Sequence, residues 1–339
     1  MTPFPSRPAP MAEPAAEPLV PAPWGTGVAF VTGAAGFLGG AFASALAEAG
    51  WTVAGFGHPP RGGGGARLRR LASWREGDVE ADALAAAAAR AGTPEIVFHA
   101  AGGASVGASL ADPEADARRT LGSLSQTLAF MRGAAASARL LYPSSAAVYG
   151  ADHPGPIAED DALNPISPYG RHKLEAERLI REAAAGFGLD AVVVRFFSLY
   201  GPGLRKQLPW ELAGRLLAGP AGVELSGTGE EVRDFLYVAD AVRLLGLAAR
   251  LPRQDGPLVL NGGGGAPVTV RELAEALGRA VGSGARLSFS GQARAGDPAC
   301  LLADPARAAA LGFAPAVDLQ EGLARLAAWV REETAAPAP

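Results

Sequence analysis

The segment that most constrains the fold is "GVAFVTGAAGFLGGAFASALAEAG", residues 27–50. Its apolar residues up to Thr32 predict a buried strand, and the alanine-rich stretch that follows predicts a helix. Glycines between the two permit a tight turn, and a helix N-terminus offers free N–H groups to a phosphate. The segment therefore predicts a dinucleotide-binding turn that involves Gly33, Gly36, Phe37, Leu38 and Gly39.

Further apolar runs alternate with helical stretches along the first two hundred residues. The runs are "WTVAGF", "EIVFHA", "RLLYPSS" and "AVVVRFF", and helices are expected at Ala81–Ala91, Pro113–Arg132 and Pro168–Phe187. This alternation predicts an α/β fold with a doubly wound parallel sheet, a Rossmann domain, over residues 25–200.

Beyond Gly201 the order loosens. Short strands in "GVELSG", "DFLYV" and "PLVLNG", and helices at Thr269–Val281 and Leu319–Arg331, predict a smaller mixed α/β substrate lobe over residues 201–332. Residues 238–262 are expected to return to the first domain as a helix and a strand. The Pro/Ala-rich ends, residues 1–24 and 333–339, are expected to be disordered tails, and the glycine runs at 62–65 and 262–265 to be flexible loops.

Composition excludes several classes of function. The formal net charge of −4 gives no electrostatic reason to expect a nucleic acid or an anionic membrane as partner. The single cysteine, Cys300, excludes an internal disulfide and fits a reducing compartment. No apolar run is long enough to span a bilayer, and prolines interrupt the N-terminal segment where a signal peptide needs an apolar core. A cytoplasmic protein without a metal site is expected.

The stretch "SPYGRHKLEAE", residues 167–177, carries the candidate chemistry. Tyr169 and Lys173 are four residues apart and so share one helical face. A nearby ammonium favours the phenolate, and we expect it to lower the tyrosine pKa toward a value useful for proton transfer. Ser145 follows a predicted strand in "YPSSAAVYG", at the sheet edge where ligands bind. Ser145, Tyr169 and Lys173 are therefore the candidate catalytic residues.

Several motifs in order resemble the extended short-chain dehydrogenase/reductases, in the nucleotide-sugar epimerase/dehydratase branch. They are "VTGAAGFLG", "GDV", "FHAAG", "YPSSAAVYG", "SPYGRHKLEAE", "RFFSLYGPG", "GTGEEVRDFLYVADAV" and "ADPARAAALGFAPAVDLQEGL". The resemblance implies a Ser/Tyr/Lys triad at the three residues above, with Tyr169 and Lys173 also touching the cofactor. It implies cofactor contacts from Asp78, Val79, Ala100, Ala101 and Gly102, and substrate contacts from Ser144, Ser198, Arg233 and Arg294. It further implies a nucleotide-diphosphate sugar as substrate and a homodimer built on residues 113–132 and 168–187.

The cofactor stays open between NAD and NADP. An acid usually ends the second strand and holds the ribose of NAD. This chain has "AGFGHPPRGGGGARLRR" there, so His58 and Arg61 are the candidate contacts. An arginine in this loop suits the 2′-phosphate of NADP, whereas a solvated loop with backbone contacts suits NAD.

Two further positions depart from the family pattern. Arg119 and Ser198 stand where the family usually has asparagine, and "GLRKQLPWEL" is a subgroup feature whose Arg205 and Lys206 are available for anions. Ala146 and Ala147 stand where dehydratases of the family have an acid and a base, so dehydration is not expected. The remaining hypotheses are a C4 epimerase that passes through a 4-keto sugar, an NADPH-dependent reductase of a 4-keto sugar, and a non-catalytic binder of NAD(P).

Overall fold

The computed structural model describes residues 25–59, 65–292 and 298–335. The expected N-terminal tail, Arg61 and Arg294 lie outside the described residues, as do the last four residues of the expected C-terminal tail. The tail prediction was wrong for residues 333–335. The last helix, α12 (Leu319–Ala335), continues through them, and Glu333 forms an ion pair with Arg205.

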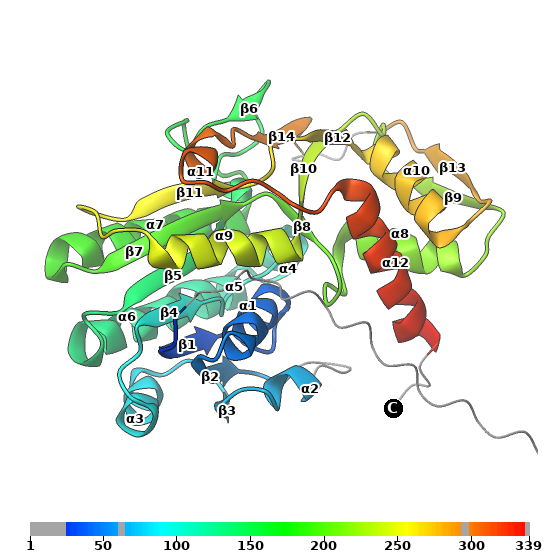
Figure 1. The fold of residues 1–339 in the computed structure, drawn as a ribbon. Coiled ribbons are helices and arrows are strands. Elements are labelled where there is room, and N and C mark those ends of the chain that lie inside the picture. The colour runs from blue at the N-terminus through cyan, green and yellow to red at the C-terminus, as the bar shows by residue number, and fades with distance from the viewer. Residues whose placement is uncertain (1–24, 60–64, 293–297, 336–339) are drawn as a thin grey trace, which may run out of the picture.

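A seven-stranded parallel sheet forms the larger part of the molecule (Figure 1). Its strand order is β11-β7-β5-β4-β1-β2-β3. The chain order reverses between β1 and β4, which is the switch point where ligands bind in such sheets. The doubly wound α/β fold is confirmed. The strands are β1 (Val28–Thr32), β2 (Thr52–Gly57), β3 (Ser73–Glu76), β4 (Ile96–His99), β5 (Arg139–Ser145), β7 (Asp190–Phe196) and β11 (Leu258–Gly262).

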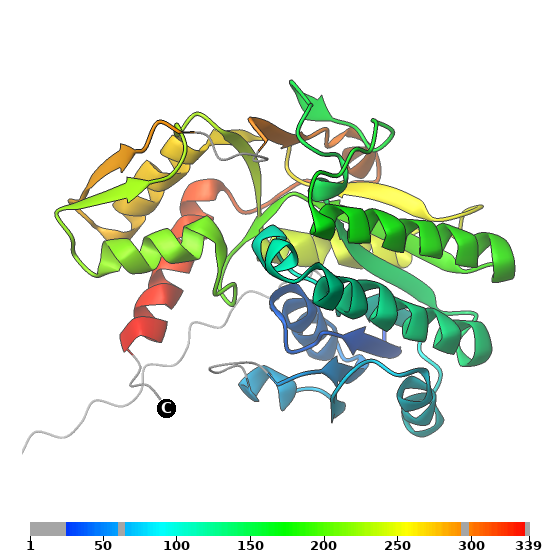
Figure 2. The same ribbon diagram turned by 180° about the vertical axis from the view of Figure 1, so that it is seen from behind.

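Helices cover both faces of this sheet. On one face, α1 (Phe37–Glu48) packs beside α9 (Val238–Arg250), as Figure 1 shows. On the other face lie α3 (Ala81–Ala91), α6 (Ser123–Ala134) and α7 (Pro168–Phe187), seen from behind in Figure 2. Each face has its own apolar core, because the central strands are buried on both sides.

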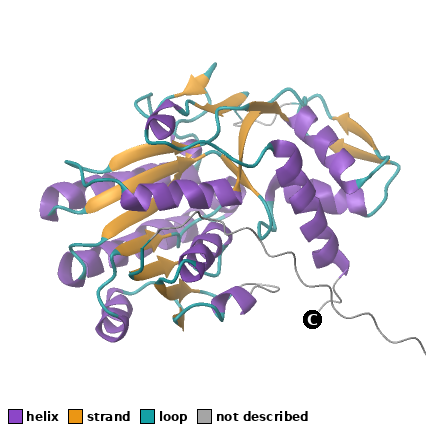
Figure 3. Ribbon diagram, in the orientation of Figure 1, coloured by secondary structure: helices purple, strands orange, loops and turns teal. Residues whose placement is uncertain are grey.

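A smaller lobe stands beside the carboxyl edge of the sheet (Figure 3). Three mutually packed helices form its body: α8 (Gln207–Leu217), α10 (Val270–Val281) and α12. One small sheet contains β12 (Pro267–Thr269), β10 (Val232–Tyr237), β14 (Cys300–Ala303) and β6 (Pro156–Ile157), with β8 (Ser198–Tyr200) beside β10. A two-stranded sheet joins β9 (Gly222–Leu225) to β13 (Arg286–Phe289).

The helix expected at Pro113–Arg132 is interrupted in the structure. A short helix α5 (Pro113–Ala117) leads into a π-turn at Arg118–Gly122, and α6 follows. The wider turn sets Arg118 and Arg119 against the cavity described below. Single π-turns inside helices frequently occur at functional sites. The short elements that the sequence analysis omitted include the helices α2 (Gly65–Leu68) and α4 (Val106–Ala111).

The second glycine run is a packed turn and not a flexible loop. Gly264 and Gly265 each donate a backbone N–H, at 2.8 Å, to the buried carboxylate of Asp234. A Cβ at Gly262 would lie 2.4 Å from Phe196, and one at Gly263 would lie 2.5 Å from Asp234. Glycine is therefore needed there for close packing. Burial raises the pKa of Asp234, although the backbone donors oppose the effect.

A last short helix, α11 (Ala306–Ala310), packs on β11. Within the described residues, no helix combines the length and the apolar character that a membrane span requires.

Candidate active site

One cavity of about 1760 Å³ lies where the carboxyl edge of the large sheet meets the lobe. Every described residue that the sequence analysis singled out for cofactor, catalysis or substrate lines this cavity: Gly33, Gly36, Phe37, Leu38, Gly39, His58, Asp78, Val79, Ala100, Ala101, Gly102, Ser144, Ser145, Tyr169, Lys173, Ser198 and Arg233. The fold thus brings the residues together.

The glycine turn has the geometry that a pyrophosphate requires. Gly33 adopts a φ of 67°, and a Cβ there would lie 2.7 Å from the backbone of Ala100. A Cβ at Gly39 would lie 2.2 Å from the carbonyl oxygen of Gly33. Helix α1 has no side-chain cap and no acid in its first turn, so no side chain occupies its free N–H groups. The residues of this first turn line the cavity, and the positive end of the helix dipole therefore lies at the cavity. These residues fit a dinucleotide.

A histidine and an aspartate meet beyond the ends of β2 and β3. Nε2 of His58 lies 2.9 Å from a carboxylate oxygen of Asp78, and both side chains are largely exposed. Two basic residues of the following loop, Arg67 and Arg70, point elsewhere. Arg70 binds Glu48 at 2.8 Å, and the guanidinium of Arg67 lies against Gly203 of the lobe. The structure therefore supplies a carboxylate near this rim, from the turn after β3 and not from the end of β2.

Helix α7 begins at the cavity with a well-defined cap. The hydroxyl of Ser167 accepts a hydrogen bond from the N–H of Gly170, and Pro168 occupies the first turn, where its missing N–H costs nothing. A Cβ at Gly170 would lie 2.5 Å from the carbonyl oxygen of Ala147. Glycine therefore allows the helix to approach the turn after β5, which brings Tyr169 beside Ser145.

Lys173 is held one helical turn further on. Its Nζ donates a hydrogen bond of 2.8 Å to the carbonyl oxygen of Pro143 and lies 5.8 Å from the ring centroid of Tyr169. Burial lowers the pKa of Lys173 to about 8, with Asp116 and Glu177 opposing the shift and Lys206 reinforcing it. Burial raises the pKa of Tyr169 to about 12, against a hydrogen bond with Ser145 that lowers it. The expectation of a lowered tyrosine pKa was wrong, because desolvation outweighs the neighbouring groups.

A buried polar network stands behind the serines of β5. Ser144 donates its hydroxyl hydrogen to Glu177 at 2.6 Å, and Arg195 binds the same carboxylate. Arg195 also donates to the hydroxyl of Tyr149, which donates to Asn261 at 2.7 Å. Ser144, expected to contact substrate, thus uses its donor inside the protein.

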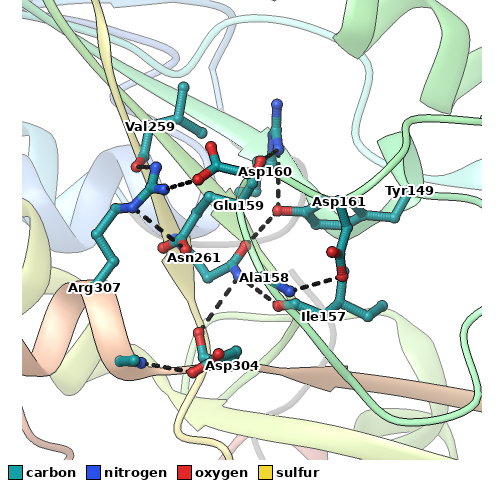
Figure 4. Close-up of polar contacts among 12 residues, drawn as sticks. Tyr149, Ile157, Ala158, Glu159, Asp160, Asp161, Val259, Asn261, Asp304 and Arg307 are labelled. Carbon is teal, nitrogen blue, oxygen red and sulfur yellow. Dashed lines mark hydrogen bonds and ion pairs between the residues drawn. The ribbon is translucent and has the colours of Figure 1, made fainter.

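The same network extends to the loop that carries β6. Asn261 donates its backbone N–H to Glu159 at 2.8 Å and its side-chain N–H to the carbonyl of Ile157, and Figure 4 shows these residues together. Arg307, from α11, binds Asp160 at 2.6 Å beside Glu159 (Figure 4). The loop after Tyr149 is therefore fixed to the large sheet from two sides.

The lobe contributes the other wall of the cavity. Ser198 lies on β8, which pairs with β10 opposite Phe235. Arg233, on β10, donates to the carbonyl oxygens of Val232 and Pro298, each at 2.8 Å. The start of α8 completes the wall with Lys206, which donates to the carbonyl of Ala104 at 2.6 Å.

Two polar clusters beside the site were missed by the sequence analysis. His172 Nδ1 lies 2.6 Å from Asp116, a buried carboxylate that a Cβ at Gly103 would meet at 1.9 Å. His99 is fully buried among Thr32, Ser123 and Thr127, and burial lowers its pKa to about 3, so it is neutral. The one feature of the sequence that could have indicated the first cluster is the position of His172 directly before Lys173.

Comparisons with known proteins agree with this geometry. Residues 29–263 match the model of the NAD dependent epimerase/dehydratase family. A UDP-glucose 4-epimerase of Azospirillum brasilense is 32% identical over 321 residues, covering 89% of this chain and 91% of that protein. The structure of a UDP-glucose 4-epimerase of Thermotoga maritima with UDP-glucose superposes with a TM-score of 0.81 at 29% identity, covering 91% of this chain and 99% of that one.

A second solved structure, MoeE5 with UDP-glucuronic acid and NAD, gives a TM-score of 0.78 at 32% identity. It covers 90% of this chain and 99% of that one. These matches extend over nearly the full length of the similar proteins and include both lobes. The chain therefore belongs to the NAD dependent epimerase/dehydratase family.

Proposed function

We propose that the protein is a nucleotide-sugar epimerase that inverts C4 of a nucleotide-diphosphate sugar through a 4-keto intermediate. The observation that carries the proposal is the meeting of Ser145, Tyr169 and Lys173 in a cavity whose other walls are the glycine turn and Arg233. The similarity to UDP-glucose 4-epimerases over most of the chain supports it.

In the proposed reaction Tyr169 exchanges the proton of the 4-hydroxyl group, while Ser145 orients that hydroxyl by a hydrogen bond. NAD held at the turn of Gly33, Gly36 and Gly39 would supply the hydride acceptor and donor for C4. Tyr169 is protonated at neutral pH in the free protein, because its pKa is about 12. Acceptance of the sugar proton therefore requires that binding of the ligands lower this pKa, and the ammonium of Lys173 favours that change.

The turn after Ser145 supports epimerisation over dehydration. Ala146 and Ala147 line the cavity and offer no titratable side chain next to the reacting sugar. Removal of water needs a general acid and a general base at the reacting carbons. A hydride cycle needs only the proton exchange at Tyr169.

We propose NAD as the cofactor. The Asp78 carboxylate beside His58 would repel the 2′-phosphate of NADP, and Arg67 and Arg70 are engaged at other places. The similar structure of MoeE5 contains NAD. Titration of the apoprotein with NADH and NADPH tests this cofactor choice. NADH should have the lower dissociation constant, and Asp78→Asn should reduce the ratio between the dissociation constants of NADPH and NADH.

The first experiment identifies the nucleotide released when the purified protein is denatured. Stoichiometric NAD supports a closed hydride cycle, and conversion of UDP-glucose without added cofactor, followed by chromatography, completes the test. Empty protein that consumes NADPH with a 4-keto sugar would establish the reductase instead. Retained cofactor without turnover of any nucleotide sugar would establish the non-catalytic binder.

A homodimer formed through α6 and α7 is part of the proposal. The two helices lie side by side on the outer face of the sheet (Figure 2), and Leu128 and Leu179 are only partly buried there. Sedimentation velocity of the purified chain tests it, and a charged residue in place of Leu179 should give the monomer.

A further inference from the structure

Lys206 has a position in the cavity that the proposed reaction does not explain. It is the residue before α8, in the stretch "GLRKQLPWEL". Its side chain extends from the lobe to the opposite wall, where Nζ donates to the carbonyl oxygen of Ala104, directly after Gly102 and Gly103. The next residue, Gln207, has a φ of 68°, a value that is unfavourable for a side chain other than glycine. Such strain persists where the surrounding structure fixes it.

The charge of Lys206 is not balanced within the part of the chain that the structure describes. Its one described partner is a neutral carbonyl group, and burial lowers its pKa with no carboxylate acting in the other direction. The neighbouring Arg205, in contrast, binds Glu333 and stacks over Trp329. A partly buried cation without a counter-ion is costly, and an anionic ligand would remove that cost.

The anion that Lys206 would bind belongs near the reacting carbon. Lys206, Lys173 and Tyr169 line the same cavity, with Nζ of Lys206 at the carbonyl of Ala104, and the charge of Lys206 lowers the pKa of Lys173. The diphosphate has another candidate partner, Arg233 on β10. The ring carbon next to C4 is C5, which carries the exocyclic C6, and a carboxylate at C6 would lie two bonds from the reacting centre.

We propose that Lys206 is a specificity-determining residue that binds the carboxylate of the sugar, so that the substrate is a nucleotide-linked uronic acid. This inference rests on the proposed function and names the substrate class of the same site. In the complex the ammonium exchanges the Ala104 carbonyl for the carboxylate, which forms a charge-assisted hydrogen bond at this position. A neutral sugar has a hydroxyl at C6 and leaves the cation unpaired.

The test compares UDP-glucuronate with UDP-glucose on the cofactor-loaded enzyme. We expect the wild-type protein to favour UDP-glucuronate in kcat/KM, and Lys206→Met to reduce that preference about 10- to 100-fold, the usual effect of a lost hydrogen bond to a charged group. Lys206→Arg should retain most of the preference for UDP-glucuronate, because it keeps a cation at this position. Arg205→Gln is the matched control, because it removes an adjacent cation that is directed at Glu333.

Binding of UDP, UDP-glucose and UDP-glucuronate by calorimetry separates the remaining outcomes. If Lys206→Met weakens all three equally, the residue binds the diphosphate and the inference is wrong. If the wild-type enzyme epimerises UDP-glucose with no preference for the acid, the inference fails while the proposed function stands. If neither sugar is converted, the proposed function fails, and the binding ratios alone decide the role of Lys206. Circular dichroism and the retained cofactor establish that each variant is folded.

Discussion

Glu177 and Arg195 form a bidentate ion pair behind the end of β5, with nitrogen–oxygen distances of 3.0 and 2.7 Å. Both side chains are almost completely buried, and the same carboxylate accepts the hydroxyl hydrogen of Ser144. Arg195 comes from β7 and Glu177 from the helix that carries Tyr169 and Lys173. The pair therefore fixes the strand end that bears Ser145 relative to the helix that bears Tyr169 and Lys173.

Glu177→Gln should destabilise the protein by about 3–5 kcal/mol, because it leaves the guanidinium of Arg195 buried without its counter-ion. Urea unfolding followed by circular dichroism measures the loss. Glu175→Gln is the control, since its partner Arg178 is 60% exposed, and such surface pairs contribute about 1 kcal/mol or less. Equal effects of the two substitutions would contradict a stabilising role for the buried pair.

Two glycines of α7 should respond in opposite directions to alanine. Gly170→Ala places a Cβ 2.5 Å from the carbonyl of Ala147, so the start of the helix must shift and both stability and turnover should fall. Gly186→Ala meets nothing within 4 Å and should stabilise the helix by about 0.5–1 kcal/mol. Thermal melts and kcat of both variants check this. A stable, active Gly170→Ala variant would show that the close approach is not required.

Lys173 should make the free energy of unfolding rise with pH above about 8. Its pKa is about 8 in the folded protein against the ordinary lysine value of 10.5, so between these values the unfolded chain binds more protons. Stability should therefore increase by up to about 3 kcal/mol across this window, relative to Lys173→Met. Urea titrations of both proteins from pH 7 to pH 10 measure the difference. Parallel pH profiles of the two proteins would contradict the shifted pKa.

Tyr169→Phe should lower kcat by about 10²- to 10⁴-fold, the usual contribution of a general acid or base. The variant should retain its bound cofactor, because the glycine turn and the start of α1 are unchanged. Nucleotide released on denaturation and turnover of the nucleotide sugar are measured on the same sample. A variant that keeps full activity would remove Tyr169 from the reaction.

The sequence was sufficient for every strand of the large sheet except β3, because long apolar runs that alternate with helices have few other solutions. β3 was missed for a physical reason. Ser73, Arg75 and Glu76 are exposed on this edge strand, and its one partly buried side chain, Trp74, gives no periodic pattern. The glycine turn and the Tyr169–Lys173 pair were found because each depends on local spacing alone.

What local spacing does not reveal is burial and long-range contact. The pKa of Tyr169 was predicted in the wrong direction, because a neighbouring lysine is visible in the sequence and the desolvation of the phenol is not. The carboxylate beside His58 comes from Asp78, twenty residues away along the chain. In the same way, four consecutive glycines suggest a linker until the carboxylate of Asp234 is seen against them.

The contact between Asp234 and the glycines at 264 and 265 lies where the chain passes between the lobe and the large sheet, and this path limits where the chain can be divided. The segment that leaves the lobe through Asp234 returns to the large sheet as α9 and the edge strand β11, before the chain enters the lobe again. A fragment that ends at residue 200 would lack one outer strand and the helix that covers β5 and β7 on one face. The two lobes are therefore not independent modules. Recombination between relatives should preserve function when the exchanged piece keeps residues 232–265 with the sheet on which they pack.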